Sequence, residues 1–224
     1  MAIRQTSPLK IKLCPFLSTH KAESAMKKIR SIALLICMFG VAAVAFSQSP
    51  VRLRGVIEKI DSSTLTFRER NGEVLALKIA EKFPIQEVYP IDITAIESNA
   101  YLGIATLTRA DGVLEALEVL VFPEAARGSG EGHYPWDLQP GSSMTNATVA
   151  NLVRTDKSRM LTMKYKDGEK TIFVPESAPI VTFKPGNAEL LIPGAFAMIT
   201  AVLKDGRPTV MRVNVGKNGF KPPM

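Results

Sequence analysis

Cysteine and histidine are scarce in this chain of 224 residues, and their positions restrict its chemistry. Both cysteines, Cys14 and Cys37, lie before residue 48, and so does His20. The rest of the chain therefore holds one histidine, His133, and no thiol. Thiol catalysis and cysteine-ligated zinc are excluded from that part. The absence of cysteine also fits an oxidising compartment, where spare thiols form incorrect disulfides.

Net positive charge is also scarce once the N-terminal segment is set aside. The formal net charge is +7, but residues 1–47 hold seven of the 28 Lys and Arg residues and one of the 21 acidic residues. The remaining chain carries 21 basic against 20 acidic side chains. Nucleic-acid binding depends on a strong basic field, so this balance predicts no nucleic-acid partner.

The longest apolar run near the N-terminus is too short for a typical membrane span, which needs about 20 residues. Met26-Lys-Lys-Ile-Arg30 is a positive segment, and Ile32–Phe46 is apolar apart from one glycine. This pattern predicts a signal helix in a leader over residues 1–47, with a true start at Met26 and cleavage after Ser47. We expect a periplasmic or secreted protein. The alternative is an uncleaved signal anchor, which would be its membrane attachment.

Similar segments recur along the rest of the chain at a nearly constant distance. The offset stays at 94–96 residues, which chance rarely maintains, so residues 48–122 and 148–216 are interpreted as tandem repeats. Residues 123–147 then form a connector, and residues 217–224 form a C-terminal tail. The recurring landmarks are Val56-Ile-Glu-Lys-Ile-Asp61 with Leu152-Val-Arg-Thr-Asp156, Asn71-Gly72 with Asp167-Gly168, Phe83-Pro84 with Ala178-Pro179, and Asp111-Gly112 with Asp205-Gly206.

Apolar and polar residues alternate within each repeat, which is the pattern of half-buried strands. The Asn-Gly and Asp-Gly pairs predict type I′ hairpin turns between strands. The expected strands lie near 51–60, 64–70, 73–79, 101–109 and 113–122, and near 148–155, 160–166, 169–174, 195–204 and 208–215.

Between the third and fourth strands, residues 90–98 and 186–192 are expected to form short helical turns. This layout predicts an all-β fold of two tandem, small five-stranded OB-like barrels, with SH3-like barrels as the alternative. Repeats of about 70 residues have marginal cores, so we expect the barrels to pack together through an apolar interface.

The connector has the most unusual composition in the chain. His133, Tyr134, Trp136 and Asp137 lie within five positions, and Trp136 is the only tryptophan. Loops carry functional residues, so these four are candidates for a ligand- or partner-binding pocket between the barrels. The alternative is that Tyr134 and Trp136 form an aromatic plug that joins the repeats.

Other motifs in the connector predict no cofactor, metal or catalytic set. Gly128-Ser-Gly-Glu-Gly132 resembles a phosphate loop, but no helix follows it, so we interpret it as a flexible linker. His133 and Asp137 lack a recognisable nucleophile for a triad. His133 with Glu131 and Asp137 is a weak metal-site candidate.

Five segments carry a family resemblance: Glu118-Val-Leu-Val-Phe-Pro-Glu-Ala-Ala-Arg-Gly, Gly130-Glu-Gly-His-Tyr-Pro-Trp-Asp-Leu, Ser143-Met-Thr-Asn-Ala-Thr-Val, Lys164-Tyr-Lys-Asp-Gly-Glu-Lys and Val213-Asn-Val-Gly-Lys-Asn-Gly. In these segments the chain resembles an uncharacterised family of exported bacterial proteins with tandem β-barrel domains, whose relatives are sometimes labelled as a permease of a metal transport system. The resemblance covers roughly residues 51–224 and implies no catalytic residues.

Three functions remain open from the sequence. The first is a non-enzymatic exported binding or scaffold protein, whose partner is another envelope protein or a small ligand. The second is an auxiliary metal-binding protein near a transporter, centred on His133. The third is an enzyme acting on envelope material with carboxylates as acid and base.

Overall fold

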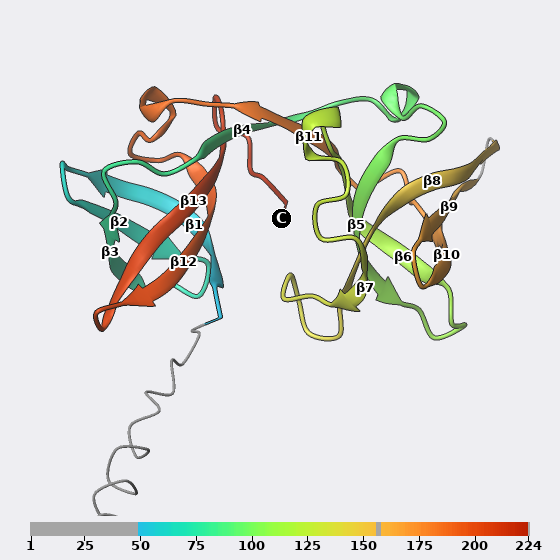
Figure 1. Cartoon of the computed structure of the whole chain (residues 1–224), viewed down its shortest axis with the longest axis horizontal. Coiled ribbons are helices and arrows are strands. Elements are labelled where there is room, and N and C mark those ends of the chain that lie inside the picture. Colours follow the sequence, from blue (N-terminus) through green and yellow to red (C-terminus); the bar gives the residue numbers. More distant parts are fainter. Residues whose placement is uncertain (1–48, 156–157, 224) are drawn as a thin grey trace, which may run out of the picture. The chain divides into compact units, whose positions relative to one another are not determined.

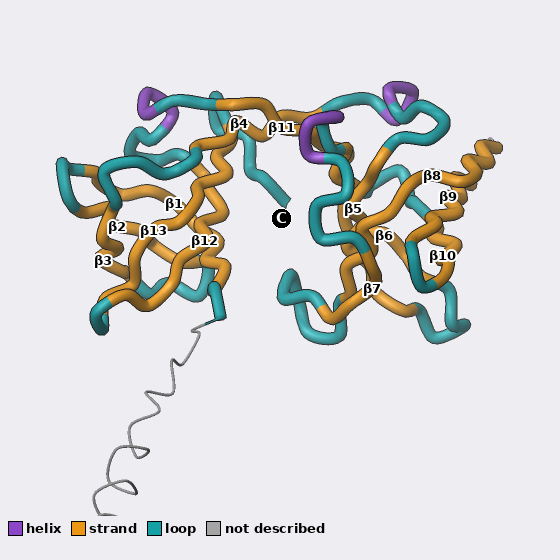
Figure 2. Tube along the Cα trace, in the orientation of Figure 1, coloured by secondary structure: helices purple, strands orange, loops and turns teal. Residues whose placement is uncertain are grey.

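The computed structural model describes residues 49–155 and 158–223 of the chain, and their fold is all-β. The expected signal helix in residues 1–47 lies outside the described residues. Figure 2 shows that strands make up most of the described chain, with three short 3₁₀ turns between them. No helix among the described residues has the length and hydropathy of a membrane span.

The strands occur in two sets that follow the same order. The first set comprises β1 (Val51–Ile60), β2 (Thr64–Glu69), β3 (Val74–Ile79), β4 (Ile85–Pro90), η1 (Ile93–Ala95), β5 (Tyr101–Thr108) and β6 (Leu114–Val121). The second comprises β8 (Ser143–Thr155), β9 (Ser158–Tyr165), β10 (Gly168–Phe173), β11 (Ile180–Pro185), η3 (Ala188–Leu190), β12 (Phe196–Lys204) and β13 (Arg207–Gly216). Between them lie η2 (Glu124–Ala126) and β7 (Gly132–Pro135).

Each barrel is closed by strands from both halves of the chain (Figure 1). The first ring is β1–β2–β3–β13–β12, in which β3 and β13 run parallel and β12 pairs with β1. The second ring is β8–β9–β10–β6–β5, in which β10 and β6 run parallel. The all-β, OB-like prediction is therefore confirmed at the level of five-stranded closed barrels. The sequence analysis predicts that each barrel closes within its own half of the chain. Instead, the last two strands of each half, β5–β6 and β12–β13, complete the barrel of the other half.

The exchange follows from two strands that the sequence analysis missed. β4 pairs antiparallel with β11, and each also pairs parallel with the last strand of a barrel, β13 and β6 respectively. The chain leaves the first barrel along β4, enters the second as β5 and β6, and returns along β11. Both strands end at a proline, a residue that argues against a strand when the sequence is read alone.

Three apolar clusters hold these strands together. One cluster lies inside each barrel and combines residues from both halves of the chain. Examples are Ile57 and Val213 in the first barrel, and Ile104 and Leu161 in the second. The third cluster fills the space beside the β4–β11 pair and supplies the expected apolar interface. It is composed of Val88, Leu120, Val181 and Met198, with Phe122, Phe183 and Phe220 packed against them.

The hairpin turns differ from the predicted type at three of the four positions. Only Asp205 and Gly206 both have positive φ, at 52° and 73°, as a type I′ turn requires. At Gly72 and Gly112 the glycine alone has positive φ, which is typical of a type I turn followed by a G1 bulge. Gly168 pairs with Tyr165, so the tip of that hairpin lies one residue earlier than expected.

Candidate functional site

The connector is anchored to the second barrel through β7. This short strand pairs antiparallel with β8, so that His133 lies opposite Thr145 and Tyr134 opposite Met144. His133 Nδ1 and Thr145 Oγ1 are 2.9 Å apart and share a hydrogen bond. Burial lowers the pKa of His133, and the nearby charge of Lys170 lowers it further. His133 is therefore a neutral, half-buried residue on the sheet at pH 7.

Tyr134 is linked to the barrel through Asn146 on β8. The Asn146 amide nitrogen donates to the Tyr134 hydroxyl at 3.0 Å and to the backbone carbonyl of Ser129 at 3.1 Å. A carbonyl accepts only, so these bonds fix the amide with its nitrogen toward the connector and its oxygen away from it. Burial raises the pKa of Tyr134, so its hydroxyl stays protonated at neutral pH.

Asp137 is held by arginines of the first barrel. Its carboxylate accepts from Arg54 at 2.7 Å and from Arg52 at 3.1 Å, both on β1. Arg70, the residue after β2, donates to the backbone carbonyl of Leu138 at 2.6 Å. Burial alone raises the pKa of Asp137, but the bonds and charges of Arg54 and Arg52 outweigh it, so the pKa is lowered. Asp137 thus ties the connector to the first barrel as a fixed anion.

Trp136 lies between these two anchors. The Arg52 guanidinium stands 4.0 Å from the centroid of its ring, and the Tyr134 ring meets it edge-on with centroids 6.1 Å apart. The cation–π contact and the aromatic pair fix the plane of the indole. Its ring N–H is buried and has no hydrogen-bond partner among the described residues. The indole borders a cavity.

This cavity, of about 380 Å³, is lined by both barrels, the connector and the β4–β11 pair. Its apolar lining includes Leu120, Phe122, Met144, Phe183 and Met198. The size and mixed lining are those of a small-molecule site. Its polar lining side chains include Glu118, Trp136, Asn146, Asn214, Arg52 and Arg212.

Five of the polar atoms on these lining side chains are buried without a partner among the described residues. They are both carboxyl oxygens of Glu118, the ring nitrogen of Trp136 and the side-chain oxygens of Asn146 and Asn214. Native proteins pair the great majority of such atoms, and each unpaired one costs about 1–3 kcal/mol. Their concentration around one cavity is the strongest functional signal in the described chain.

Glu118 is the residue that sequence reasoning missed. Its side chain is fully buried, and this burial raises its pKa to about 8, against the opposing charge of Arg54. The acid is therefore mostly neutral at pH 7. The signal in the sequence was an acidic residue within the apolar run Ala116–Phe122, where a solvated side chain is not expected.

The structure places the four candidate residues next to one another but gives them different roles. Trp136 lines the cavity, Tyr134 supports it through Asn146, and Asp137 is an anchor. The weak metal candidates do not meet: Glu131 accepts from the backbone N–H of Lys166, and His133 bonds Thr145. Within residues 49–155 and 158–223, no group of three or more His, Cys, Asp or Glu residues is arranged to hold a metal ion.

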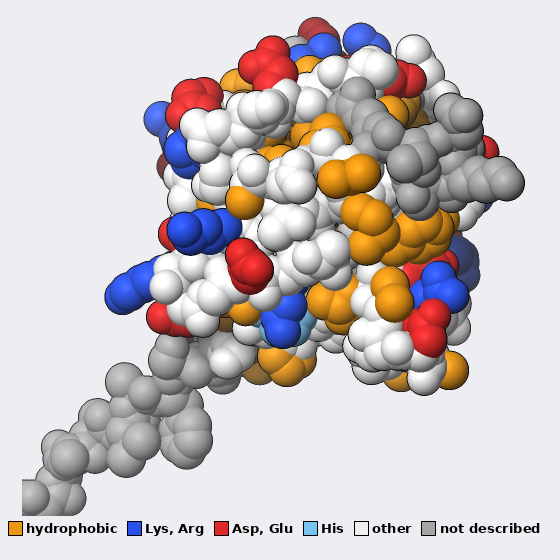
Figure 3. All heavy atoms as spheres, turned by 90° about the vertical axis from the view of Figure 1, so that its right-hand side faces the viewer, with side chains coloured by type: hydrophobic (Ala, Val, Ile, Leu, Met, Phe, Trp, Pro, Cys, Tyr) orange, Lys and Arg blue, Asp and Glu red, His pale blue; other side chains and the backbone are white. Residues whose placement is uncertain are grey.

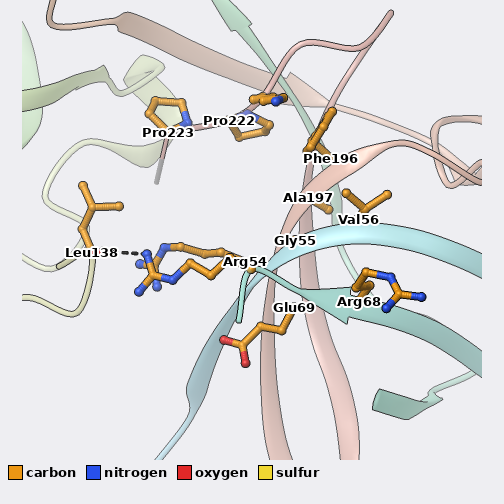
Figure 4. A pocket seen from close by; sticks show the side chains of 12 residues that line it. Arg54, Gly55, Val56, Arg68, Glu69, Leu138, Phe196, Ala197, Pro222 and Pro223 are labelled. Carbon is orange, nitrogen blue, oxygen red and sulfur yellow. Dashed lines mark hydrogen bonds between the residues drawn. The ribbon is translucent and has the colours of Figure 1, made fainter. Parts of the chain in front are cut away.

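A second cavity, of about 310 Å³, lies beside β1 and β2 and is bordered by the C-terminal tail (Figure 4). Its arginines already have partners, because Arg68 pairs with Glu58, and Arg70 with the carbonyl of Leu138. The face in Figure 3 shows acidic and basic side chains interspersed. Neither feature provides a concentrated charge for a large anionic partner.

Comparisons of the chain with protein-family models, curated proteins and solved structures found no match.

Proposed function

We propose that the protein is an exported, non-enzymatic binding protein that takes a small ligand in the cavity between its two barrels. Export is supported by the positive and apolar segments of the leader. We also propose that the two halves are tandem copies, because the β5–β6 and β12–β13 pairs carry a register shift at the same place, after Ala105 and Thr200.

The observation that carries this proposal is the set of unpaired polar atoms around the cavity. A ligand that pairs Glu118, Asn146 and Asn214 would recover the free energy lost by burying them alone. The apolar lining would supply contact area, and the fixed indole of Trp136 would orient the ligand. A binding role is favoured over carboxylate catalysis because the cavity lining holds one carboxylic acid, Glu118, and acid–base catalysis of that kind uses two.

Trp136 provides a direct test, because it is the only tryptophan and it borders the cavity. The purified protein is titrated with a library of small metabolites, and indole fluorescence and the unfolding temperature are both recorded. We expect at least one class of compound to change the emission in a saturable way and to raise the unfolding temperature.

A matched pair of variants locates the binding. Thr200→Phe places a bulky side chain in the cavity and should abolish the response, whereas Leu203→Phe on the same strand changes an exposed position and should preserve it. A library in which no compound alters fluorescence or stability would contradict the proposal. So would a ligand whose binding is unaffected by Thr200→Phe.

A further inference from the structure

Hydrogen-bond acceptors outnumber donors among the unpaired atoms of the cavity. The acceptors are the Glu118 carboxyl group and the amide oxygens of Asn146 and Asn214, while the donors are the Trp136 N–H and the O–H of Glu118 when it is protonated. The orientation of the Asn146 amide is fixed by its bond to the Ser129 carbonyl, so its oxygen is the group left to bind a ligand. Three acceptor side chains match the three N–H donors of a primary ammonium group.

Two of these acceptors, Asn146 and Glu118, lie on the strands on either side of β5. Gly103 lies opposite Asn146 on β8, and Ala105 lies opposite Glu118 on β6. Both β5 residues are small, and a Cβ atom on Gly103 would lie 2.6 Å from the Asn146 oxygen. The amide therefore reaches over β5 only because the side chain there is absent.

The cations that line the cavity lie on the wall formed by the first barrel. Arg212 on β13 lies opposite Thr200, in the register position that corresponds to Glu118 beside Ala105. Its side chain is exposed, and within the described residues no hydrogen bond or ion pair is assigned to it. Arg52 also lines this wall, but its charge is already opposed by Asp137. The cavity thus has a wall of the second barrel with two acceptors, and a wall of the first barrel with Asn214 and one uncompensated cation.

We infer that the ligand is an amino-acid-like zwitterion, whose primary ammonium group donates to Glu118, Asn146 and Asn214 and whose acidic group faces Arg212. This assignment rests on the proposed function. A cation without an acidic group would meet the uncompensated charge of Arg212, whereas an anion without an amine would leave the three acceptors unpaired. The apolar part of the ligand packs on Leu120, Phe122 and Phe183.

Binding of this kind exchanges a proton. Burial raises the pKa of Glu118 to about 8, so the acid is mostly protonated at pH 7 before a ligand binds. An ammonium group beside it stabilises the carboxylate, and the proton leaves to solvent. The charged groups that line the cavity besides Glu118 are Arg52 and Arg212, and Arg54, which pairs with Asp137, opposes the rise in the pKa of Glu118. Close to one proton should be released per ligand bound.

Three related aromatic compounds test the ammonium group and the acidic group of the ligand separately. They are phenylalanine, 2-phenylethylamine, which lacks the carboxylate, and 3-phenylpropionate, which lacks the amine. Trp136 fluorescence should report tightest binding for phenylalanine, binding at least tenfold weaker for the amine, and no saturable binding for the acid. Calorimetry of phenylalanine in buffers of different ionisation enthalpy should report the released proton.

Two variants with matched controls test which residue binds the ammonium group of the ligand and which faces its acidic group. Glu118→Gln should weaken phenylalanine binding at least tenfold and abolish proton release, whereas Glu115→Gln on the same strand should do neither. Arg212→Gln should reduce phenylalanine binding to the level of 2-phenylethylamine, and Arg207→Gln on the same strand should leave it unchanged. The unfolding temperature of each variant verifies that it is folded.

Three results would overturn the inference: equal binding of 3-phenylpropionate and phenylalanine, an unchanged affinity in Glu118→Gln, or no binding of any of the three compounds. The metabolite library separates this failure from that of the proposed function. A library ligand that lacks an amine and responds to Thr200→Phe would refute the amino-acid-like assignment and leave a binding protein. No ligand at all would refute both.

Discussion

The two barrels place different chemistry at corresponding positions of the same strand framework. Beside the register shift of β5–β6, Ala105 lies opposite Glu118, and beside that of β12–β13, Thr200 lies opposite Arg212. The second barrel therefore presents a buried acid where the first presents an exposed cation. The backbone register makes the cavity possible, and the side chains at each position decide what it can bind.

The neighbouring position shows the same contrast. Gly103 lies opposite Asn146 in the second barrel, and Met198 lies opposite Arg54 in the first. Gly103 leaves room for an amide oxygen, whereas Met198 fills its site and joins the apolar cluster between the barrels. Arg54 turns to the connector instead and binds Asp137. One barrel is hollow at this point, and the other is packed and ion-paired.

The largest expected effect concerns the buried acid. The ordinary pKa of a glutamate is 4.5, and burial raises that of Glu118 to about 8. The unfolded chain therefore loses this proton at lower pH than the folded chain does. Stability from this group is fully present below pH 4.5 and is lost as the pH rises to about 8, by on the order of 5 kcal/mol.

Glu118→Gln should remove this pH dependence, because glutamine does not titrate. Urea unfolding at pH 5 and pH 9 measures it: the variant should match the wild type at pH 5 and exceed it at pH 9. Glu115→Gln, at a partly exposed position on β6, is the control and should follow the wild type. An equal change in stability between pH 5 and pH 9 in Glu118→Gln and in the wild type would contradict the burial of a neutral acid.

The next largest effect on stability is expected at Gly103, where β5 carries no side chain. Gly103→Ala would bring a Cβ to 2.6 Å from the Asn146 oxygen and 3.0 Å from the Phe122 ring, and Asn146 is held by its two other bonds. We expect a loss of about 2 kcal/mol, as for overpacking. At the corresponding position Met198→Leu keeps the volume and should cost less than about 1.5 kcal/mol. Equal losses in urea unfolding would show that the two positions are packed alike.

The sequence predicts the strands of the barrels better than their partners. The alternation over Val51–Ile60 marks β1 to the residue, because a half-buried strand needs a period of two. Which strand closes against β3 is a different matter, since β6 and β13 alternate similarly and each presents a suitable edge. The choice depends on β4 and β11, whose pairing is a tertiary contact that no local pattern encodes.

The candidate site was predicted in part for a similar reason. Trp136 stands out by composition, and it does line the cavity. Glu118 is unusual as an acid within the apolar run Ala116–Phe122, but the sequence does not show which face of the strand it lies on until the register shift is known. Leu117 is skipped in the pairing of β5 with β6, so Ala116 and Val119 both face the core and Glu118 turns toward the cavity. A bulge reverses the phase of a strand, and one sequence does not reveal where it occurs.

The smallest expected effect distinguishes the two arginines that bind Asp137. The Arg54 side chain is 10% exposed and that of Arg52 is 31% exposed, so water screens the Arg54 pair less. Arg54→Met should cost about 2 kcal/mol, because it removes a buried, charge-assisted bond. Arg52→Met should cost less than about 1 kcal/mol, and its share should shrink further in 1 M salt.

Urea unfolding at low and high salt measures both changes, and the far-UV spectrum of each variant verifies the strand content. Arg109→Met, which removes exposed ion pairs with Asp111 and Glu115, is a control for the loss of a surface arginine. Equal costs for Arg54 and Arg52 would mean that the connector is held by long-range attraction to a basic strand. Unequal costs would mean that one buried contact holds the connector, and with it Trp136, against the cavity.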